Sequence, residues 1–199
     1  MIHELIQRLA WLGHDGYRLD GDPVIYFDPY EIKSKTPADI IFISHEHFDH
    51  CSPADVAKIQ KEDTVIVTDV ASATKLQGNV KTMKAGDRFT VKGVEVEAVP
   101  AYNVDKQFHP QDAGMLGFIV SIGGVRVYHA GDTDFIPEMN DIETDIALLP
   151  VSGTYVMTAD EAIQAARAID PKVAIPMHYG AIVGGQTDAE RFRDQLAGK

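Results

Sequence analysis

Residues 41–51 read Ile41-Phe42-Ile43-Ser44-His45-Glu46-His47-Phe48-Asp49-His50-Cys51, an apolar run followed at once by imidazole and carboxylate side chains. The run has the composition of a buried strand, and the polar residues after it would form a turn at its end. Imidazole nitrogen and carboxylate oxygen are donors that zinc and related transition metals accept in proteins. Three of the eight histidines of the chain lie in residues 45–50, which favours a metal site over solvated surface histidines or a helix-start cluster.

Other short runs of apolar or β-branched residues predict further strands. Several are continuously apolar instead of alternating, which is typical of strands covered on both faces. Turn signals at 21–23, 92–93 and 123–124 separate neighbouring strands and mark hairpins, so we expect sheets that are partly antiparallel or mixed. The predicted strands lie at 24–27, 40–43, 64–68, 94–99, 117–122, 125–129, 146–149 and 173–175.

Three helix starts can be recognised from capping residues. Ser52 can cap a helix that has Pro53 in its first turn. Thr158 with Glu161 forms a capping box that opens a helix to about Ile169, and residues 187–190 form a second box that opens the last helix. The stretch from 103 to 115 is the longest irregular one, and its length predicts a functional loop.

Composition limits the class of protein and its partners. A chain of 199 residues is the size of one domain, and its 45% apolar and 24% charged residues are ordinary for a globular fold. Thirty acidic against 18 basic residues give a net charge of −12, which disfavours nucleic acid and leaves a small-molecule substrate as the expected partner. One cysteine allows no internal disulfide. Because the sequence has no signal peptide or membrane span, we expect a cytoplasmic protein without a membrane partner. The composition is also compatible with a homo-oligomer.

The pattern His45-x-His47-x-Asp49-His50 resembles the signature of the metallo-β-lactamase-fold superfamily. The segment 128–133, Tyr-His-Ala-Gly-Asp-Thr, and the segment 175–180, Ile-Pro-Met-His-Tyr-Gly, resemble two later motifs of that superfamily. The openings 11–16 and 27–29 are similar to those of a branch of uncharacterised metal-dependent hydrolases related to ascorbate-6-phosphate lactonase. The resemblance spans nearly the whole chain and implies one metallo-β-lactamase-like hydrolase domain over residues 1–199, a layered α/β (α+β) fold in which two mixed sheets form a four-layer αββα sandwich.

The same resemblance implies a dinuclear site at one edge of the sandwich. One metal would take His45 and His47 plus a third histidine, the other would take Asp49, His50 and His178, and Asp132 would bridge them. The third histidine of related branches follows a Pro-Ala-aromatic strand end, where this chain has Asn103. An amide oxygen is a poor zinc ligand, so His109 on the following loop is the expected substitute. Without it, the first metal would be weakly held.

Five further residues have weaker assignments. His14 is expected to reach the site as a substrate contact or as a partner of a ligand. His129 is expected to be a buried histidine or to orient a ligand, and not to bind metal itself. Tyr179 either packs in the core or donates its hydroxyl to an oxyanion. Cys51 is expected to be a structural thiol, and Glu46 to point away from the metal.

These residues predict a metal-dependent hydrolase, most simply with one or two Zn²⁺ ions per chain, although Mn²⁺, Fe²⁺ or Ni²⁺ would fit similar donors. Water activated by the metal would attack a small ester, lactone or phosphodiester, with Asp49 and Asp132 as catalytic carboxylates that orient it. Two alternatives stay open: an iron-dependent oxidoreductase on the same scaffold, and a binding module in which the metal only braces the fold.

Overall fold

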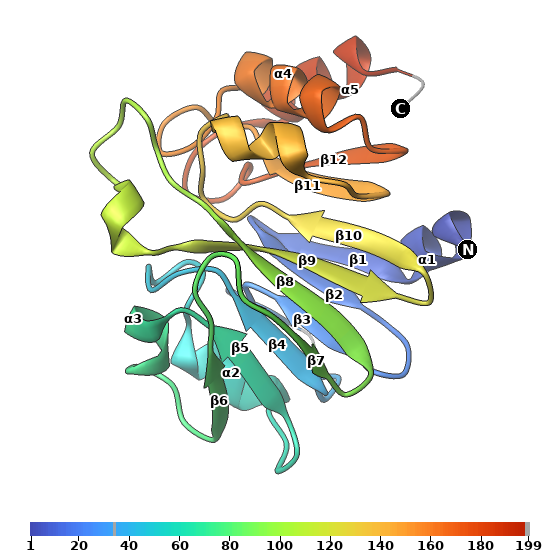
Figure 1. Cartoon of the computed structure of the whole chain (residues 1–199), viewed down its shortest axis with the longest axis vertical. Coiled ribbons are helices and arrows are strands. Elements are labelled where there is room, and N and C mark those ends of the chain that lie inside the picture. The colour runs from blue at the N-terminus through green and yellow to red at the C-terminus, as the bar shows by residue number, and fades with distance from the viewer. Residues whose placement is uncertain (34, 198–199) are drawn as a thin grey trace.

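The computed structural model describes residues 1–33 and 35–197, which form two six-stranded sheets packed face to face (Figure 1). The first sheet consists of β1 (Leu9–Gly13), β2 (Gly16–Leu19), β3 (Ile25–Phe27), β4 (Ile40–Ile43), β5 (Val65–Thr68) and β6 (Asn79–Thr82), in that order. The second has the order β12 (Val173–Met177), β11 (Ile146–Pro150), β10 (Val125–His129), β9 (Leu116–Ile122), β8 (Val94–Pro100) and β7 (Arg88–Val91).

Both sheets are mixed, as the turn signals predicted. In the first sheet β1, β2 and β3 pair antiparallel, and β3 to β6 run parallel. In the second sheet β7 to β10 are antiparallel, and β10, β11 and β12 are parallel. The three expected hairpins are present, between β2 and β3, β7 and β8, and β9 and β10.

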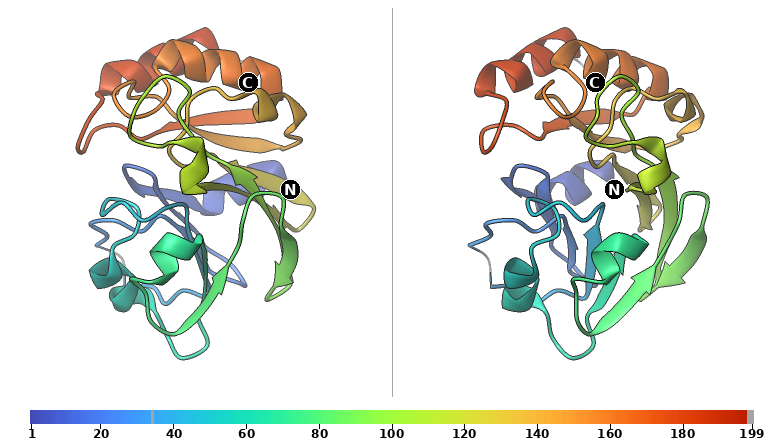
Figure 2. Two further views of the ribbon diagram at one scale, coloured as in Figure 1. Left: turned by 60° about the vertical axis from the view of Figure 1, so that its left-hand side comes forward. Right: turned by 90° about the vertical axis from the view of Figure 1, so that its left-hand side faces the viewer.

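Helices cover the outer faces of the sandwich, as the two side views in Figure 2 show. The helices α4 (Ala159–Ile169) and α5 (Gln186–Gln195) lie over β11 and β12, while α2 (Pro53–Ile59) lies over the first sheet. Three short helical elements and one short N-terminal helix complete the fold: α1 (Ile2–Arg8), α3 (Val70–Ala73), η1 (Gln111–Ala113) and η2 (Pro137–Asp141). The four layers confirm the predicted αββα architecture.

Strand β4 explains why the run before the histidines is wholly apolar. Ile40 and Phe42 belong to the core between the sheets, where the Phe42 ring lies 5.1 Å from that of Phe118. Ile41 and Ile43 point to the other face and pack with Val56 of α2. Because all four side chains are fully buried, the strand is fixed from both sides, and the loop that follows starts from a rigid base.

Two of the three predicted helix starts agree with the structure. Ser52 caps α2 by accepting from the Asp55 N–H at 3.3 Å. Thr158 and Glu161 form the reciprocal capping box of α4. The box predicted at residues 187–190 is wrong by position: α5 begins at Gln186, and Asp188 accepts from the backbone of Gly185 at 2.8 Å.

Sequence patterns missed the short peripheral elements. Strands β1, β6 and β7 are sheet edges, and β2 is a four-residue neighbour of one edge. Strands β6 and β7 are largely exposed, so they lack the apolar run that marks the central strands. Their pairing is decided by the neighbouring strand and not by local composition.

Candidate metal centre

The predicted ligands come together at one edge of the sandwich, where strands of both sheets end. The loop 44–50 follows β4 of the first sheet, whereas Asp132 and His178 follow β10 and β12 of the second. His14 lies in the turn between β1 and β2, and His109 lies in the long loop between β8 and β9. Every one of these chain segments is far from the others in sequence, and the two sheets bring them to one place.

A first group of donors consists of His45, His47 and His109, whose ligand atoms lie within 4.8 Å of one another. His47 Nδ1 is 3.0 Å from His45 Nε2 and 3.2 Å from His109 Nε2. His45 and His109 are buried, and His47 is half-buried. The structure therefore brings His109, and not Asn103, to the position where the third histidine was expected.

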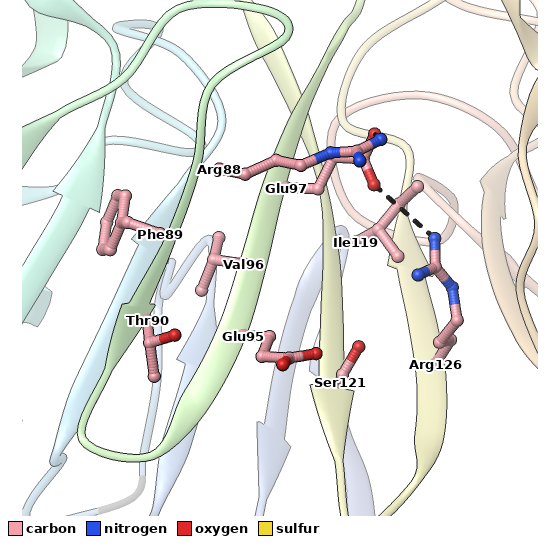
Figure 3. A pocket seen from close by; sticks show the side chains of 9 residues that line it. All are labelled: Arg88, Phe89, Thr90, Glu95, Val96, Glu97, Ile119, Ser121 and Arg126. Atoms are coloured by element: carbon pink, nitrogen blue, oxygen red, sulfur yellow. Dashed lines mark hydrogen bonds and ion pairs between the residues drawn. The ribbon is translucent and has the colours of Figure 1, made fainter.

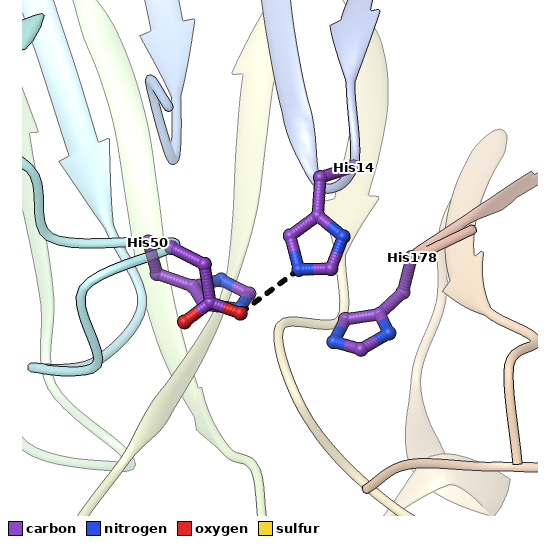
Figure 4. Close-up of side chains that lie close together, drawn as sticks. His14, His50 and His178 are labelled. Atoms are coloured by element: carbon purple, nitrogen blue, oxygen red, sulfur yellow. Dashed lines mark hydrogen bonds and ion pairs between the residues drawn. The ribbon is translucent and has the colours of Figure 1, made fainter. Parts of the chain in front are cut away.

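A second group consists of His14, Asp49, His50 and His178. Figure 4 shows the rings of His14, His50 and His178 arriving from three different segments and converging on one point. His14 Nε2 is 3.1 Å from Asp49 Oδ2, and His50 Nε2 is 3.7 Å from the same oxygen. His14 therefore lies at the site. Its ring nitrogen is one of the donor atoms of this group, so it is placed to bind metal as well as to contact Asp49.

Asp132 lies between the two groups and turns one oxygen to each. Its Oδ2 is 3.3 Å from His109 Nε2 and 3.8 Å from His45 Nε2. Its Oδ1 is 3.3 Å from both His50 Nε2 and His178 Nε2. This carboxylate has the geometry to bridge two cations.

The hydrogen bonds on the far side of each ring leave a lone pair aimed inward. His109 Nδ1 faces the Tyr155 carbonyl at 3.0 Å, and His50 Nδ1 faces Asp28 Oδ2 at 2.8 Å. Both acceptors require a proton on Nδ1, and because burial lowers the pKa of His109, its neutral ring leaves Nε2 bare. His50 Nε2 and Asp132 Oδ1 are buried with no hydrogen-bond partner. His109 Nε2 lies 3.2 Å from His47 Nδ1, so imidazole nitrogens that can bind a cation face one another here, and the donor set fits a metal centre.

The electrostatics of these side chains are consistent with this fit. Burial, followed by repulsion from the neighbouring His50, holds the pKa of His45 well below its ordinary value. Burial opposes protonation of His178 too, but Asp132 and Asp15 outweigh it and raise the pKa of His178 to about 9. Burial would raise the pKa of Asp132, yet His178 and His50 hold that pKa well below its usual range. Asp132 is therefore ionised, and its negative charge is stabilised by positive charge on either side.

Backbone strain is concentrated at this edge. His14, Asp28 and His178 have φ values of 51°, 38° and 59°, a region that residues with a Cβ seldom adopt. Gly131 has φ 63°, and a Cβ there would lie 2.8 Å from the Leu116 carbonyl oxygen. A glycine is needed at this turn because it sets the direction of the following Asp132.

Several residues named from the sequence stay outside the donor groups. His129 is buried, stacks on Phe27 with ring centroids 5.2 Å apart, and approaches the Asp15 carbonyl at 2.9 Å. Tyr179 is half-buried and stacks on Trp11 at 4.7 Å. Cys51 is buried, and burial raises the pKa of its thiol to about 11. Glu46 pairs with Lys75 at 3.0 Å, away from the histidines.

Sequence reasoning missed the residues that support the ligands. Asp28 holds His50 Nδ1 and also accepts from the backbone and hydroxyl of Ser44 at 2.8 and 2.6 Å. Ser152 Oγ lies 2.7 Å from His178 Nδ1. Asp15 is fully buried among His50, Asp132 and His178, and burial raises its pKa well above the ordinary value. The openings 11–16 and 27–29, which contain Asp15 and Asp28, were the signals that could have found two of these residues, and nothing in the sequence singled out Ser152.

A hollow of about 330 Å³ lies on the outer face of β7, β8 and β9, away from the histidines (Figure 3). Glu97 lines it, 2.6 Å from an Arg88 nitrogen and 3.6 Å from an Arg126 nitrogen. The two arginines already neutralise the acid, and the lining offers no group of metal donors. Among the described residues, no helix has the length and apolar character needed to cross a bilayer.

The comparisons with known proteins agree with this geometry. The pattern of the family described as "Beta-lactamase superfamily domain" matches residues 8–178. A protein of Methanoculleus marisnigri, described as a UPF0173 metal-dependent hydrolase, is 35% identical, over 94% of this chain and 87% of its own length. A protein of Archaeoglobus fulgidus with the same description is 32% identical, over 96% of this chain and 91% of its own length.

Solved structures show the same fold. The crystal structure of a candidate metal-dependent hydrolase from Parabacteroides distasonis superposes with a TM-score of 0.85 at 38% identity, covering 95% of this chain and 87% of that one. A candidate zinc-dependent hydrolase of the metallo-β-lactamase superfamily from Thermotoga maritima gives a TM-score of 0.65 at 25% identity, covering 95% and 85%.

Proposed function

Because this chain belongs to the β-lactamase superfamily domain family and, within it, to the UPF0173 metal-dependent hydrolases, we propose that its two donor groups hold a pair of metal ions, with zinc the expected metal. The substrate class that we propose is a small ester, lactone or phosphodiester. The observation that carries the dinuclear assignment is Asp132, whose two oxygens face two separate histidine groups.

In this proposal His45, His47 and His109 hold the first ion, and Asp49, His50 and His178 hold the second. His14 is a further donor to the second ion, or the group that fixes Asp49 through the contact at 3.1 Å. Histidine nitrogen and carboxylate oxygen are ordinary zinc donors. More donors are present than one closed four-ligand site uses, which supports a catalytic centre over a structural brace.

A bound metal pair would lower the pKa of a coordinated water from about 15.7 toward 7 and polarise the bond to be cleaved. The chain itself supplies placement and proton handling. Asp49 has a side chain that is 14% exposed, whereas Asp132 is 4% exposed. Asp49 is therefore the carboxylate that contacts solvent and orients the attacking water. Asp132 is the buried anion that holds the two donor groups beside each other.

Elemental analysis of the purified protein tests the centre directly. We expect about two ions per chain, dominated by zinc, and their loss in the double variant His47→Ala, Asp132→Ala. The matched control is His3→Ala, Asp160→Asn, because His3 contacts Gln7 and Asp160 pairs with Arg191 on the exposed surface. That control should keep both ions.

Hydrolysis of a panel of esters, lactones and phosphodiesters by the zinc-loaded protein then tests the reaction class. Bound metal without turnover of any of the three would overturn the substrate proposal and leave the centre standing. Two iron ions with a visible absorption band would favour the oxidoreductase alternative. Absence of metal after reconstitution would refute the dinuclear centre itself.

A further inference from the structure

The entrance to the candidate centre can be located from the exposure of its donors. His45, His50, His109, Asp132 and His178 are all buried. His47 and Asp49 are the half-buried donors, and Phe48 between them is 66% exposed. The donor atoms are therefore most accessible on the side where Phe48 lies, and we call this side the entrance.

Aromatic side chains, some exposed and some half-buried, flank this entrance on two sides. On the side of the second donor group, the Phe48 ring lies 5.9 Å from that of Tyr30, which is itself 6.2 Å from the His14 ring. Also on this side, Trp11 is 44% exposed, stacks on Tyr179, and donates its Nε1–H to the His14 carbonyl at 2.9 Å.

On the side of the first donor group, Phe108 precedes His109 and is 52% exposed. Its ring meets that of Tyr155 at 4.6 Å, and the Tyr155 carbonyl faces His109 Nδ1. We call the six side chains Trp11, Tyr30, Phe48, Phe108, Tyr155 and Tyr179 the aromatic rim.

Three side chains of the aromatic rim, Trp11, Phe48 and Phe108, are exposed, whereas its three tyrosines are half-buried and Tyr179 packs against the core. Phe48 and Phe108 are adjacent in sequence to proposed ligands, yet each leaves half or more of its surface in water. Large apolar side chains gathered around one opening are typical of a binding surface, whereas scattered ones are not. The rim is continuous with the donor groups, so a ligand that covers it also reaches them.

The two lysines that reach these loops are already paired with carboxylates. Lys75 donates to the Glu46 backbone carbonyl at 2.8 Å and pairs with the Glu46 carboxylate. Lys106 pairs with Asp134 and with Asp105. Both cations are already neutralised, and the chain carries a net charge of −12. A phosphate group would therefore find no unpaired lysine among these two.

We infer that the aromatic rim binds the apolar acyl or aryl part of a neutral carboxylic ester or lactone, an inference that rests on the proposed hydrolase function. Water adds its oxygen to the acyl carbon, the bond from that carbon to the leaving oxygen breaks, and the leaving oxygen takes the proton. The products are a carboxylic acid and an alcohol, or one hydroxy acid from a lactone. Within the proposed substrate classes, the rim selects against the phosphodiester.

The first test compares p-nitrophenyl acetate, butyrate, hexanoate and bis(p-nitrophenyl) phosphate on the zinc-loaded protein. We expect kcat/KM to rise with acyl length, by up to about fourfold for each methylene that becomes fully covered. Phe48→Ala and Phe108→Ala should each lose most of that rise. Phe89→Ala is the matched control, because Phe89 lies on the edge strand β7 in the hollow of Figure 3 and should keep it. A flat profile in the unmodified protein, or a preference for the phosphodiester, would overturn the inference.

The second test is independent of turnover. Trp11 is the one tryptophan of the chain, so its fluorescence in the zinc-loaded protein reports on the aromatic rim. Titration with hexan-1-ol should change the emission, and Phe48→Ala should weaken the apparent affinity about tenfold. If no ester is hydrolysed but hexan-1-ol binds in this way, the reaction class fails and the apolar specificity of the rim survives.

Equal affinity for hexan-1-ol in Phe48→Ala and the unmodified protein would refute the role of the rim. Binding to neutral phosphatidylcholine vesicles that disappears in Phe48→Ala and Phe108→Ala, with no response to hexan-1-ol, would instead assign the rim to a membrane surface and would also refute it.

Discussion

Replacing His109 by alanine is the most informative single perturbation of the candidate centre. The ring is 1% exposed, with Nε2 at 3.2 Å from His47 Nδ1 and 3.3 Å from Asp132 Oδ2. Its removal leaves two histidines where the first ion would have three. Loss of a group that merely orients a ligand weakens metal binding by about 10-fold to 100-fold, so loss of the ligand itself should cost at least about 100-fold.

That factor corresponds to about 2.8 kcal/mol of binding free energy, since each tenfold step is about 1.4 kcal/mol. Metal that binds only the folded chain stabilises it by the same linkage. Zinc at a saturating concentration should therefore protect His109→Ala from denaturant less than it protects the unmodified protein, by at least about 2.8 kcal/mol. The assay is a competition for zinc with a chromophoric chelator, followed by urea unfolding with and without zinc.

The matched control is Asn103→Ala. Asn103 Nδ2 donates a hydrogen bond to the Tyr155 carbonyl at 2.7 Å and lies 3.2 Å from His109 Nδ1. It therefore supports the position of His109 without being a metal ligand. We expect a loss of about tenfold or less. Two zinc ions of unchanged affinity in His109→Ala, or an equal loss in Asn103→Ala, would refute the view that His109 replaces the missing histidine.

Three further changes have defined outcomes. Ser152→Ala removes the 2.7 Å contact to His178 Nδ1 and should weaken the binding of the second ion by about 10-fold. An unchanged affinity in the chelator competition would show that this contact does not orient His178. Gly131→Ala should destabilise the fold by about 1–3 kcal/mol in urea unfolding, because φ is 63° and the new Cβ would meet the Leu116 carbonyl oxygen at 2.8 Å. A free energy of unfolding within about 0.5 kcal/mol of that of the unmodified protein, as for a surface substitution, would contradict this. Burial would raise the pKa of Asp55, but Lys58, Ser52 and the Glu31 N–H lower it below its ordinary value. The Asp55 carboxylate therefore stabilises the folded state fully above about pH 4, and this stabilisation is lost as the pH falls through the lower pKa of the folded state. Asp55→Asn should therefore cost about 1–3 kcal/mol at pH 7 and progressively less toward pH 2, and a pH-independent difference in the urea midpoint would exclude this linkage.

The sequence by itself determined the features that depend on neighbouring residues. The apolar run of β4 and the cluster 45–50 lie within eleven consecutive residues, so one local pattern predicted both the strand and its donors. The caps at Ser52 and Thr158 are likewise local hydrogen bonds. The exposed edge strands escaped prediction because nothing in their own composition requires pairing.

Only the tertiary structure decided which of the remaining polar residues face the centre. Asn103 and His109 are six residues apart, and a backbone hydrogen bond of 2.7 Å from Asn103 N to His109 O closes the loop so that the histidine reaches His47. His129, the last residue of β10, stacks on Phe27, whereas the positive φ of Gly131 redirects the chain before Asp132. Strand periodicity sets the direction of a side chain within a strand, but these donors lie beyond strand ends, where contacts between distant loops set it instead.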